Sequence, residues 1–181
     1  MAAPVSIDFD DAAAPCNFAS QVPLASQYAS QGVSFAAGNG NPFEVLNQCG
    51  NFGFSAHSGS NFLAYNSSIT GSTFKAIFTE ALGSASIWAA SANGGQLLIE
   101  AYDANNVLVD SASVSASRDW QQLSVSGVGI TSLRLVGLST GAFDDFQFEV
   151  AVSNDVPEPG ALALAALGLL GVALSRRRRS V

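Results

Sequence analysis

Charge is scarce in this chain. Only 12% of its 181 residues are Asp, Glu, Lys or Arg, about half the usual share in a soluble domain. Cations are the scarcest: before residue 154 there are only Lys75, Arg118 and Arg134, against twelve acids, for a net charge of −9. Because an acidic surface repels phosphate backbones, the composition argues against nucleic-acid binding.

Histidine occurs once, at His57, and this limits the chemistry open to the chain. No G-x-S-x-G, H-E-x-x-H or phosphate-loop motif is present. A serine–histidine–aspartate site needs a serine and a carboxylate within hydrogen-bond reach of the histidine, which sequence proximity alone does not show. One histidine and two cysteines do not make a zinc site. We expect a protein that is not an enzyme, with His57 in a loop or at a rim.

Cysteine is also rare, with Cys16 and Cys49 as its two occurrences. An oxidising compartment would join them in a disulfide. Closing a loop of about 34 residues stabilises a fold by roughly 3–4 kcal/mol in the chain-entropy model. The alternative is two unpaired buried thiols. The disulfide is the prediction, because the C-terminal tail described below indicates export.

Long helical patterns are missing from residues 1–152, where short stretches alternate between apolar and polar side chains. About nine or ten strands are expected at roughly 8–12-residue spacing, among them Val5–Phe9, Thr73–Thr79, Gln96–Tyr102, Gln121–Val125, Ser132–Leu138 and Phe143–Val152. Asp103-Ala104-Asn105-Asn106 is predicted as a hairpin turn before the strand Val107–Val114. Gly127 and Gly129 are predicted to join two separate paired strands.

This pattern predicts an all-β fold, with a jelly-roll-like antiparallel β-sandwich over residues 1–152, called the head below. In such folds the first and last strands commonly lie close together. No 20–50-residue repeat is present, so solenoids and propellers are excluded. Residues 153–156 are the predicted linker to a different kind of segment.

The C-terminal segment 157–181 has three parts in order. Pro157, Glu158 and Pro159 come first; a wholly apolar stretch follows and predicts one short helix at about 160–175; Arg176, Arg177, Arg178 and Arg179 end it. Sixteen helical residues span roughly 24 Å, against a hydrocarbon core of roughly 30 Å. Snorkelling arginines and local thinning of the bilayer make up the difference.

The arginine cluster orients this segment in a membrane, with the chain end in the cytoplasm and the head outside. A buried core helix is the alternative, but the stretch has no polar face. No N-terminal signal peptide is visible, since Met1-Ala2-Ala3-Pro4 leads directly into an acidic strand. We expect that a leader has been removed or is left out of this sequence, because the tail has meaning only in an exported chain.

Pro157-Glu158-Pro159, the apolar helix and the terminal arginines resemble the PEP-CTERM sorting domain, a tail also known as the ice-binding protein C-terminal domain. The resemblance implies recognition by an exosortase, a membrane transpeptidase-like enzyme of Gram-negative bacteria, which would cut near Pro157–Pro159. The head would be periplasmic and anchored in the inner membrane before processing, then at the cell surface or extracellular. Such proteins accompany exopolysaccharide and biofilm systems.

Parts of the head are similar to carbohydrate-binding jelly rolls, in the stretches 97–105, 120–125 and 143–146. In those modules an acidic residue at the start of the last strand helps to bind a structural calcium ion. The resemblance therefore implies Asp145 as a Ca²⁺ ligand, and Asp8 and Asp10 join it if the first strand lies nearby, since Ca²⁺ prefers oxygen ligands. The alternative is a set of solvated acidic strand ends.

Trp88 is the aromatic residue of most interest for sugar binding. If Ala85, Ile87 and Ala89 face inward, Trp88 faces outward, where an indole can stack on a pyranose. With the opposite parity Trp88 packs between the sheets. Tyr102 and Tyr65 are the further candidates for such a platform, and Trp120 is expected in the core. The threonines show no regular spacing of the kind that ice binding needs.

These observations predict an exported, exosortase-sorted envelope or matrix protein with a membrane tail and a non-catalytic head. The head is expected to interact with extracellular polysaccharide or matrix. Two alternatives remain: a purely structural surface protein without a ligand, and a matrix glycan hydrolase. The hydrolase would need two carboxylates facing a cleft at glycosidase spacing.

Overall fold

The structure is a computed structural model that describes residues 3–17, 22–37, 44–53, 55–64, 73–115, 117–137 and 141–151. Its ten strands all pair antiparallel: β1 (Val5–Ile7), β2 (Val22–Pro23), β3 (Val33–Ala37), β4 (Glu44–Asn47), β5 (Asn61–Ala64), β6 (Thr73–Ser91), β7 (Gln96–Tyr102), β8 (Leu108–Ser115), β9 (Gln121–Val136) and β10 (Gly141–Val150). Within these residues the helices are two 3-10 turns, η1 (Ala29–Gln31) and η2 (Gln48–Gly50). The all-β prediction is confirmed.

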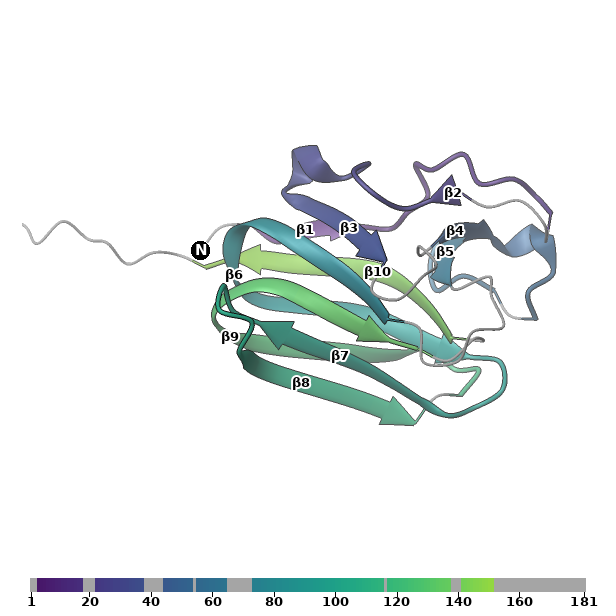
Figure 1. Cartoon of the computed structure of the whole chain (residues 1–181). Helices are drawn as coiled ribbons and strands as arrows, with labels where there is room; N and C mark the ends of the chain where they lie inside the picture. Colours follow the sequence, from purple (N-terminus) through teal and green to yellow (C-terminus); the bar gives the residue numbers. More distant parts are fainter. Residues whose placement is uncertain are drawn as a thin grey trace, which may run out of the picture.

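The strands form one hydrogen-bonded network in the order β2-β4-β5-β10-β6-β9-β7-β8, with β1 added on β10 and β3 on β6. The pairing of β1 with β10 confirms that the first and last strands are neighbours, with Val5 opposite Phe148. All of these contacts join segments that are far apart in the sequence except the β4–β5 and β7–β8 pairs. Figure 1 shows the network folded over into two layers.

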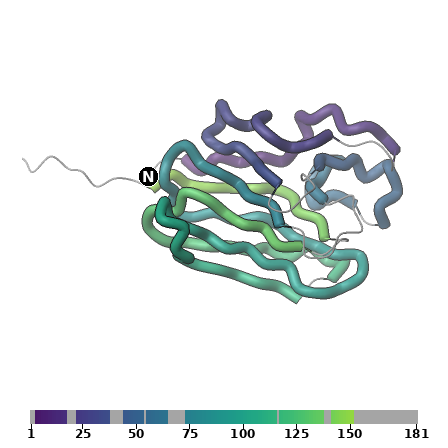
Figure 2. Tube along the Cα trace, viewed as in Figure 1, coloured from purple at the N-terminus to yellow at the C-terminus, as the bar shows by residue number. Residues whose placement is uncertain are grey.

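The two layers share the long strands β6 and β9, which curve around one edge of the sandwich (Figure 1, Figure 2). The first part of β6 pairs with β3 and with the end of β9, and its second part pairs with β10 and with the start of β9. The pairing register shifts between Ile77 and Ser84, where β6 passes from one layer to the other. We call the layer with β3 and β7 the first layer and the layer with β10 the second.

The prediction that Gln121–Val125 and Ser132–Leu138 are two paired strands is wrong, because both belong to β9. The glycines bend the strand and do not reverse it. Gly129 has φ +81°, a conformation that other residues rarely adopt, and a side chain at Gly127 would collide with Val109 of β8. The predicted strand Thr73–Thr79 is likewise only the first part of the longer strand β6.

A cluster of phenylalanine rings between the layers forms the centre of the core. Phe35 of β3 stacks on Phe74 of β6, with ring centroids 5.1 Å apart. Phe78 of β6 contacts Phe148 of β10 at 5.1 Å and Phe146 at 6.2 Å. Burial of such rings is the main favourable contribution to folding.

The predicted turn after Tyr102 is also confirmed, since β7 and β8 form a hairpin in which the Asp103 carboxylate accepts hydrogen bonds from two backbone N–H groups.

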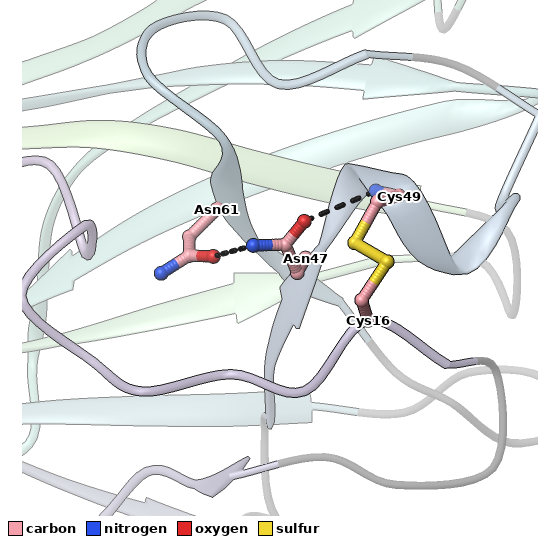
Figure 3. The surroundings of a disulfide bond; sticks show 4 residues. All are labelled: Cys16, Asn47, Cys49 and Asn61. Atoms are coloured by element: carbon pink, nitrogen blue, oxygen red, sulfur yellow. Dashed lines mark hydrogen bonds between the residues drawn. A yellow bond between two sulfur atoms is a disulfide. The ribbon is translucent and has the colours of Figure 1, made fainter.

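A disulfide joins Cys16 to Cys49 of η2, with Cα atoms 5.1 Å apart, and confirms the predicted pairing (Figure 3). The N-terminal segment is also held to the start of β5 by Asn61, whose side-chain amide donates to the backbone oxygens of Phe9 and Ala12 at 2.9 Å. Asn47 links these features: it accepts from the Cys49 N–H and donates to Asn61 (Figure 3). The N-terminal segment is thereby fastened to the loop between β4 and β5.

Replacing Cys49 by Ser should lower the free energy of unfolding by roughly 3–4 kcal/mol, because the unfolded chain loses a cross-link between residues 33 apart. Urea unfolding of the full chain in a mild detergent measures this. The Cys16→Ser/Cys49→Ser double variant should be no less stable than the single variant. A single variant as stable as the parent protein would contradict the contribution of the disulfide.

Candidate functional site

Trp88 lies on the outer face of the second layer. The same strand buries Ala85, Ile87 and Ala89 in the core. Because side chains alternate along a strand, Trp88 faces outward, where it is half-buried. Its neighbours on the adjacent strands are Gln122 of β9 and Asp144 of β10.

The loop between η2 and β5 folds over this face and brings His57 onto Trp88. The imidazole stacks on the indole with ring centroids 4.1 Å apart and an angle of 17° between the planes. Trp120, in the loop before β9, meets the imidazole edge-on at 5.7 Å and donates its indole N–H to the Ser55 oxygen. We call His57, Trp88 and Trp120 the aromatic cluster.

The expectation that Trp120 belongs to the main core is therefore wrong. It packs half-buried against a smaller apolar group on the outer face, formed by Leu46, Phe62, Ala64 and Ala142. This second group exists because the loop covers the sheet here. Arg118 also holds the loop down, with a hydrogen bond to the Gly53 oxygen at 2.9 Å.

Asp144 and Asp145 pin the loop to β10 at a β-bulge. The register of β10 against β6 shifts after Asp144, and Asp145 has φ +46°, an uncommon conformation for a residue other than glycine. The Asp144 carboxylate accepts the backbone N–H groups of His57 at 2.8 Å and Ser58 at 3.2 Å. The Asp145 carboxylate contacts His57 Nδ1 and accepts from the Ser58 hydroxyl at 2.7 Å.

Asp144 is fully buried, and this burial raises the pKa of its carboxyl to about 7. The negative charge of Asp145 acts in the same direction, whereas the hydrogen bonds from the backbone N–H groups of Asp145, Ser58 and His57 favour the ionised form. The pKa therefore lies far above the ordinary value of 3.8. The carboxyl that fastens the loop changes its charge near neutral pH.

The arrangement of His57, Ser58 and Asp145 differs from a catalytic triad. In a triad the histidine lies between the serine and the carboxylate, so that it can take the serine proton. Here the Asp145 carboxylate lies between the other two: one oxygen meets His57 Nδ1 and the other accepts from Ser58. The Ser58 hydroxyl is thus engaged by a carboxylate and is not activated by the imidazole. These contacts position a loop.

A row of uncharged polar side chains continues along the same outer face from Trp88. Gln122 donates to the Ser86 hydroxyl at 3.4 Å. Beyond it lies an open groove of about 310 Å³, lined by Ser84, Ser86, Ser124, Ser126 and Gln147 and also by the acidic Glu149. We call Ser84, Ser86, Gln122, Ser124, Ser126 and Gln147 the polar row. It offers hydroxyl and amide groups that can both donate and accept hydrogen bonds.

Tyr102 does not join Trp88 in one platform. It lies on the outer face of the first layer, where it is opposite Ser132, near the end of β9 that is remote from Gln122. Its hydroxyl donates to Glu100 at 2.8 Å. Tyr65 lies outside the described residues. The two predicted ligand residues that the structure describes, Trp88 and Tyr102, thus lie on different faces.

The predicted calcium ligands are not brought together as a set. Among the residues that the structure describes, no group of three or more His, Cys, Asp or Glu side chains could hold a metal ion. Asp8 accepts from the Asp10 N–H, and Asp10 accepts from the backbone N–H groups of Ser60 and Asn61 at 2.9 Å. Asp145 is engaged by the loop. Calcium binding stays a prediction from resemblance, without a matching ligand set.

Sequence reasoning missed His57 and Asp144 as partners in the site. One signal was present: Phe143-Asp144-Asp145-Phe146 places two acids between two inward phenylalanines, which a regular two-residue alternation does not allow. Such a break indicates a bulge, and bulges often lie beside functional sites. No local signal tells that the His57 loop, 87 residues earlier, is what the bulge holds.

The C-terminal residues 155–179 match the family model of the PEP-CTERM protein-sorting motif. An all-β sandwich with a C-terminal sorting signal is thus the class of protein defined here. The chain carries a PEP-CTERM sorting motif, which confirms the resemblance found in the sequence and indicates export and C-terminal anchoring with processing by an exosortase. In the described part of the chain no helix is long and apolar enough to span a membrane, and the predicted span 160–175 lies outside that part.

Comparison with curated proteins finds no match. Among solved structures, the chain is similar to TmCBM61 in complex with β-1,4-galactotriose, with 12% identity, 73% of this chain and 100% of the other covered, and a TM-score of 0.44. CsCBM6-3 from Clostridium stercorarium in complex with cellobiose has 15% identity, coverages of 78% and 99%, and a TM-score of 0.39. The arabinose-bound α-L-arabinofuranosidase MgGH51 has 12% identity and a TM-score of 0.46. The match covers 74% of this chain but only 25% of the arabinofuranosidase. Nothing about ligands follows from such distant likenesses.

Replacing Asp144 by Asn should change how stability depends on pH. Because the pKa of Asp144 is raised to about 7 in the folded state, its stabilising contribution is greatest below about pH 4 and is lost as the pH rises towards 7. The stability of the parent protein relative to Asp144→Asn should therefore fall over that range, by about 1.4 kcal/mol for each pKa unit of the shift.

Chemical denaturation at several pH values between 4 and 8 measures this dependence. Asp119→Asn, which removes an exposed carboxylate from the loop before β9, is the matched control. A parent-to-variant difference that rises with pH, or that is the same for Asp144→Asn and Asp119→Asn, would contradict a buried carboxyl of raised pKa at the bulge.

Proposed function

We propose that the chain is an exported envelope or matrix protein that an exosortase processes at its tail, with a head that binds extracellular polysaccharide without catalysing a reaction. The PEP-CTERM motif at residues 155–179 supports the sorting half of the proposal. The disulfide between Cys16 and Cys49 fits an oxidising compartment. Before processing the head would face the periplasm, with the tail in the inner membrane, and afterwards it would lie at the cell surface or outside.

The observation that carries the binding half is the half-exposed aromatic cluster next to the polar row on one sheet face. Sugars present apolar C–H faces and hydroxyl groups, so they suit a surface where an aromatic edge adjoins neutral donors and acceptors. Trp88 and Gln122 are cross-strand neighbours, which places the two kinds of contact side by side. A surface that extends along the paired strands β6 and β9 fits a chain of sugar units better than a single small molecule.

The engagement of Asp144 and Asp145 by the loop, and the burial of Asp144, support a binding function over hydrolysis. A glycosidase needs two carboxylates flanking the scissile bond, separated by about 5–9.5 Å across a cleft. Asp144 and Asp145 are adjacent in the chain, and both are occupied by the loop that carries His57. Asp144 is also buried, so that it does not reach a ligand on the surface. The carboxylates at this site hold the loop in place.

A structural role without a ligand is the second candidate, and one observation favours it. His57 already stacks on one face of the Trp88 indole, which leaves less of the ring for a sugar. The His57 side chain is 28% exposed and thus belongs to the same surface. In this second case the aromatic cluster only fastens the loop. The protein then binds no polysaccharide, and changes in the polar row do not alter that.

Replacing Pro157, Glu158 and Pro159 together by Ala should abolish processing, because these residues form the sorting motif. Mass spectrometry of the protein from its native host measures both chain ends. The variant should keep its C-terminus through Val181, whereas the parent protein should lose it. An Arg176→Lys variant, which retains the positive charge, is the control and should be processed. Equal cleavage of the triple variant would contradict exosortase processing at this motif.

Replacing Gln122 by Ala should weaken polysaccharide binding by about threefold to tenfold, since one hydrogen bond contributes roughly 1 kcal/mol. Gln96→Ala is the matched control, because Gln96 is also an exposed strand glutamine that donates to a serine hydroxyl, but on β7. Affinity electrophoresis of the full chain in a mild detergent, in gels that contain polysaccharide from the host's own matrix, measures the effect. Equal retardation of both variants would favour the purely structural role.

A further inference from the structure

The outer face of the first layer carries an unusual row of side chains. In the strand register, Ala36 of β3 lies opposite Lys75 of β6, Lys75 lies opposite Arg134 of β9, and Arg134 lies opposite Glu100 of β7. The inward neighbours Phe74, Ala76 and Leu135 are buried, so the row faces out. Two of the three cations of the head are thus direct cross-strand neighbours.

This placement costs stability in a protein that has acids to spare. Like charges directly opposite each other on a sheet repel, whereas an acid opposite a cation attracts it. The head has twelve acids and three cations, yet Glu100 is the one acid in the row. Glu100 compensates the charge of Arg134, but no acid lies opposite Lys75. A bound anion would compensate the repulsion.

Arg134 is held in a fixed position for such a contact. Its Nε and one terminal nitrogen both lie 2.5 Å from Glu100 Oε2, and its guanidinium carbon is 5.8 Å from the centre of the Tyr102 ring. The Tyr102 hydroxyl donates to the same Glu100 oxygen. A guanidinium has five N–H groups, so some remain for a ligand. The Arg134 side chain is 45% exposed.

The charges at this point persist over a wide pH range. Burial pushes the pKa of Glu100 upward, but the hydrogen bonds from Arg134 and Tyr102 outweigh it and hold the pKa below its ordinary value. The hydrogen bond to Glu100 raises the pKa of Arg134. Lys75, by contrast, makes no ion pair within the described residues. One cation is therefore fixed and neutralised, and its neighbour is available.

The surroundings of this pair suit a sugar ring better than a bare ion. Ile77 is 44% exposed on the same strand and faces the same side as Lys75. Ser34 lies opposite Ile77, and Ser132 lies between Ile77 and Tyr102. The side chains beside the two cations are thus small or apolar. The combination of an ammonium, a fixed guanidinium and an apolar contact recognises a carboxylate attached to a ring.

We propose that the outer face of the first layer is a second glycan site, in which Lys75 and Arg134 bind the carboxylate of an acidic sugar unit next to Ile77 and Tyr102. This site lies on a different layer from the aromatic cluster, and it goes beyond the proposed function by adding a separate face with a charged ligand. An anionic membrane surface is the competing occupant. The net charge of −9 on the head opposes adsorption to a broad anionic surface, whereas a single carboxylate senses mainly the charges within about 8 Å at physiological salt.

The test is isothermal titration of the full chain, in a mild nonionic detergent, with oligogalacturonate and with oligomannuronate. The same oligosaccharides with their carboxyl groups reduced to alcohols serve as neutral partners. We expect binding of at least one acidic oligosaccharide and about tenfold weaker binding of its reduced form. Lys75→Gln should weaken acidic binding by a similar factor, and Lys75→Arg should restore most of it. Lys75→Arg is thus the matched control, because it keeps the positive charge at the same position.

This site would be overturned by no binding of either acidic oligosaccharide, by equal binding of the reduced forms, or by equal loss in Lys75→Gln and Lys75→Arg. Sedimentation with phosphatidylglycerol vesicles that depends on Lys75, without oligosaccharide binding, would assign the face to a membrane instead. Gln122→Ala separates the two proposals, because it should spare acidic binding. Acidic binding lost in Gln122→Ala but kept in Lys75→Gln would place the ligand on the aromatic cluster alone.

Discussion

A buried carboxylate holds the candidate site together. Asp144 accepts the backbone N–H groups of His57 and Ser58, and through them it fixes the loop that brings the imidazole onto Trp88. Without these bonds the N–H groups of His57 and Ser58 would have to hydrogen-bond to water. Trp88 and Trp120 would then lose their shared contact with the His57 imidazole. The aromatic cluster and the smaller apolar group on the outer face both depend on where this loop lies.

The fold supplies the two faces that the proposals use. Because β6 and β9 curve from one layer into the other, each strand presents one set of side chains on each outer face (Figure 1). Lys75 and Trp88 both belong to β6, and Arg134 and Gln122 both belong to β9. The same two strands therefore carry a cationic pair on the first layer and an aromatic and polar surface on the second. If both proposals hold, the head contacts two polysaccharide chains at once.

Much of this could be predicted from the sequence, and particular residues show why the rest could not. Alternation placed Ala85, Ile87 and Ala89 inward and Trp88 outward, because side-chain direction in a strand follows from local geometry. The disulfide and the sorting motif were equally accessible. Gly127 and Gly129 were interpreted as a turn, although here they bend one strand, since glycine permits both and the choice depends on the packing of Val109. The contact between His57 and Asp144 spans 87 residues, and no local pattern encodes it.

The central claim is that the aromatic cluster and the polar row bind polysaccharide, and the indole N–H signals of the two tryptophans test it most directly. The chain has only Trp88 and Trp120, so ¹⁵N-labelled protein gives two such signals, which a Trp120→Phe variant assigns. On titration with polysaccharide from the host's matrix, the Trp88 signal should shift progressively and saturate. Two indole signals that stay unmoved up to saturating polysaccharide would contradict a glycan-binding role for this face.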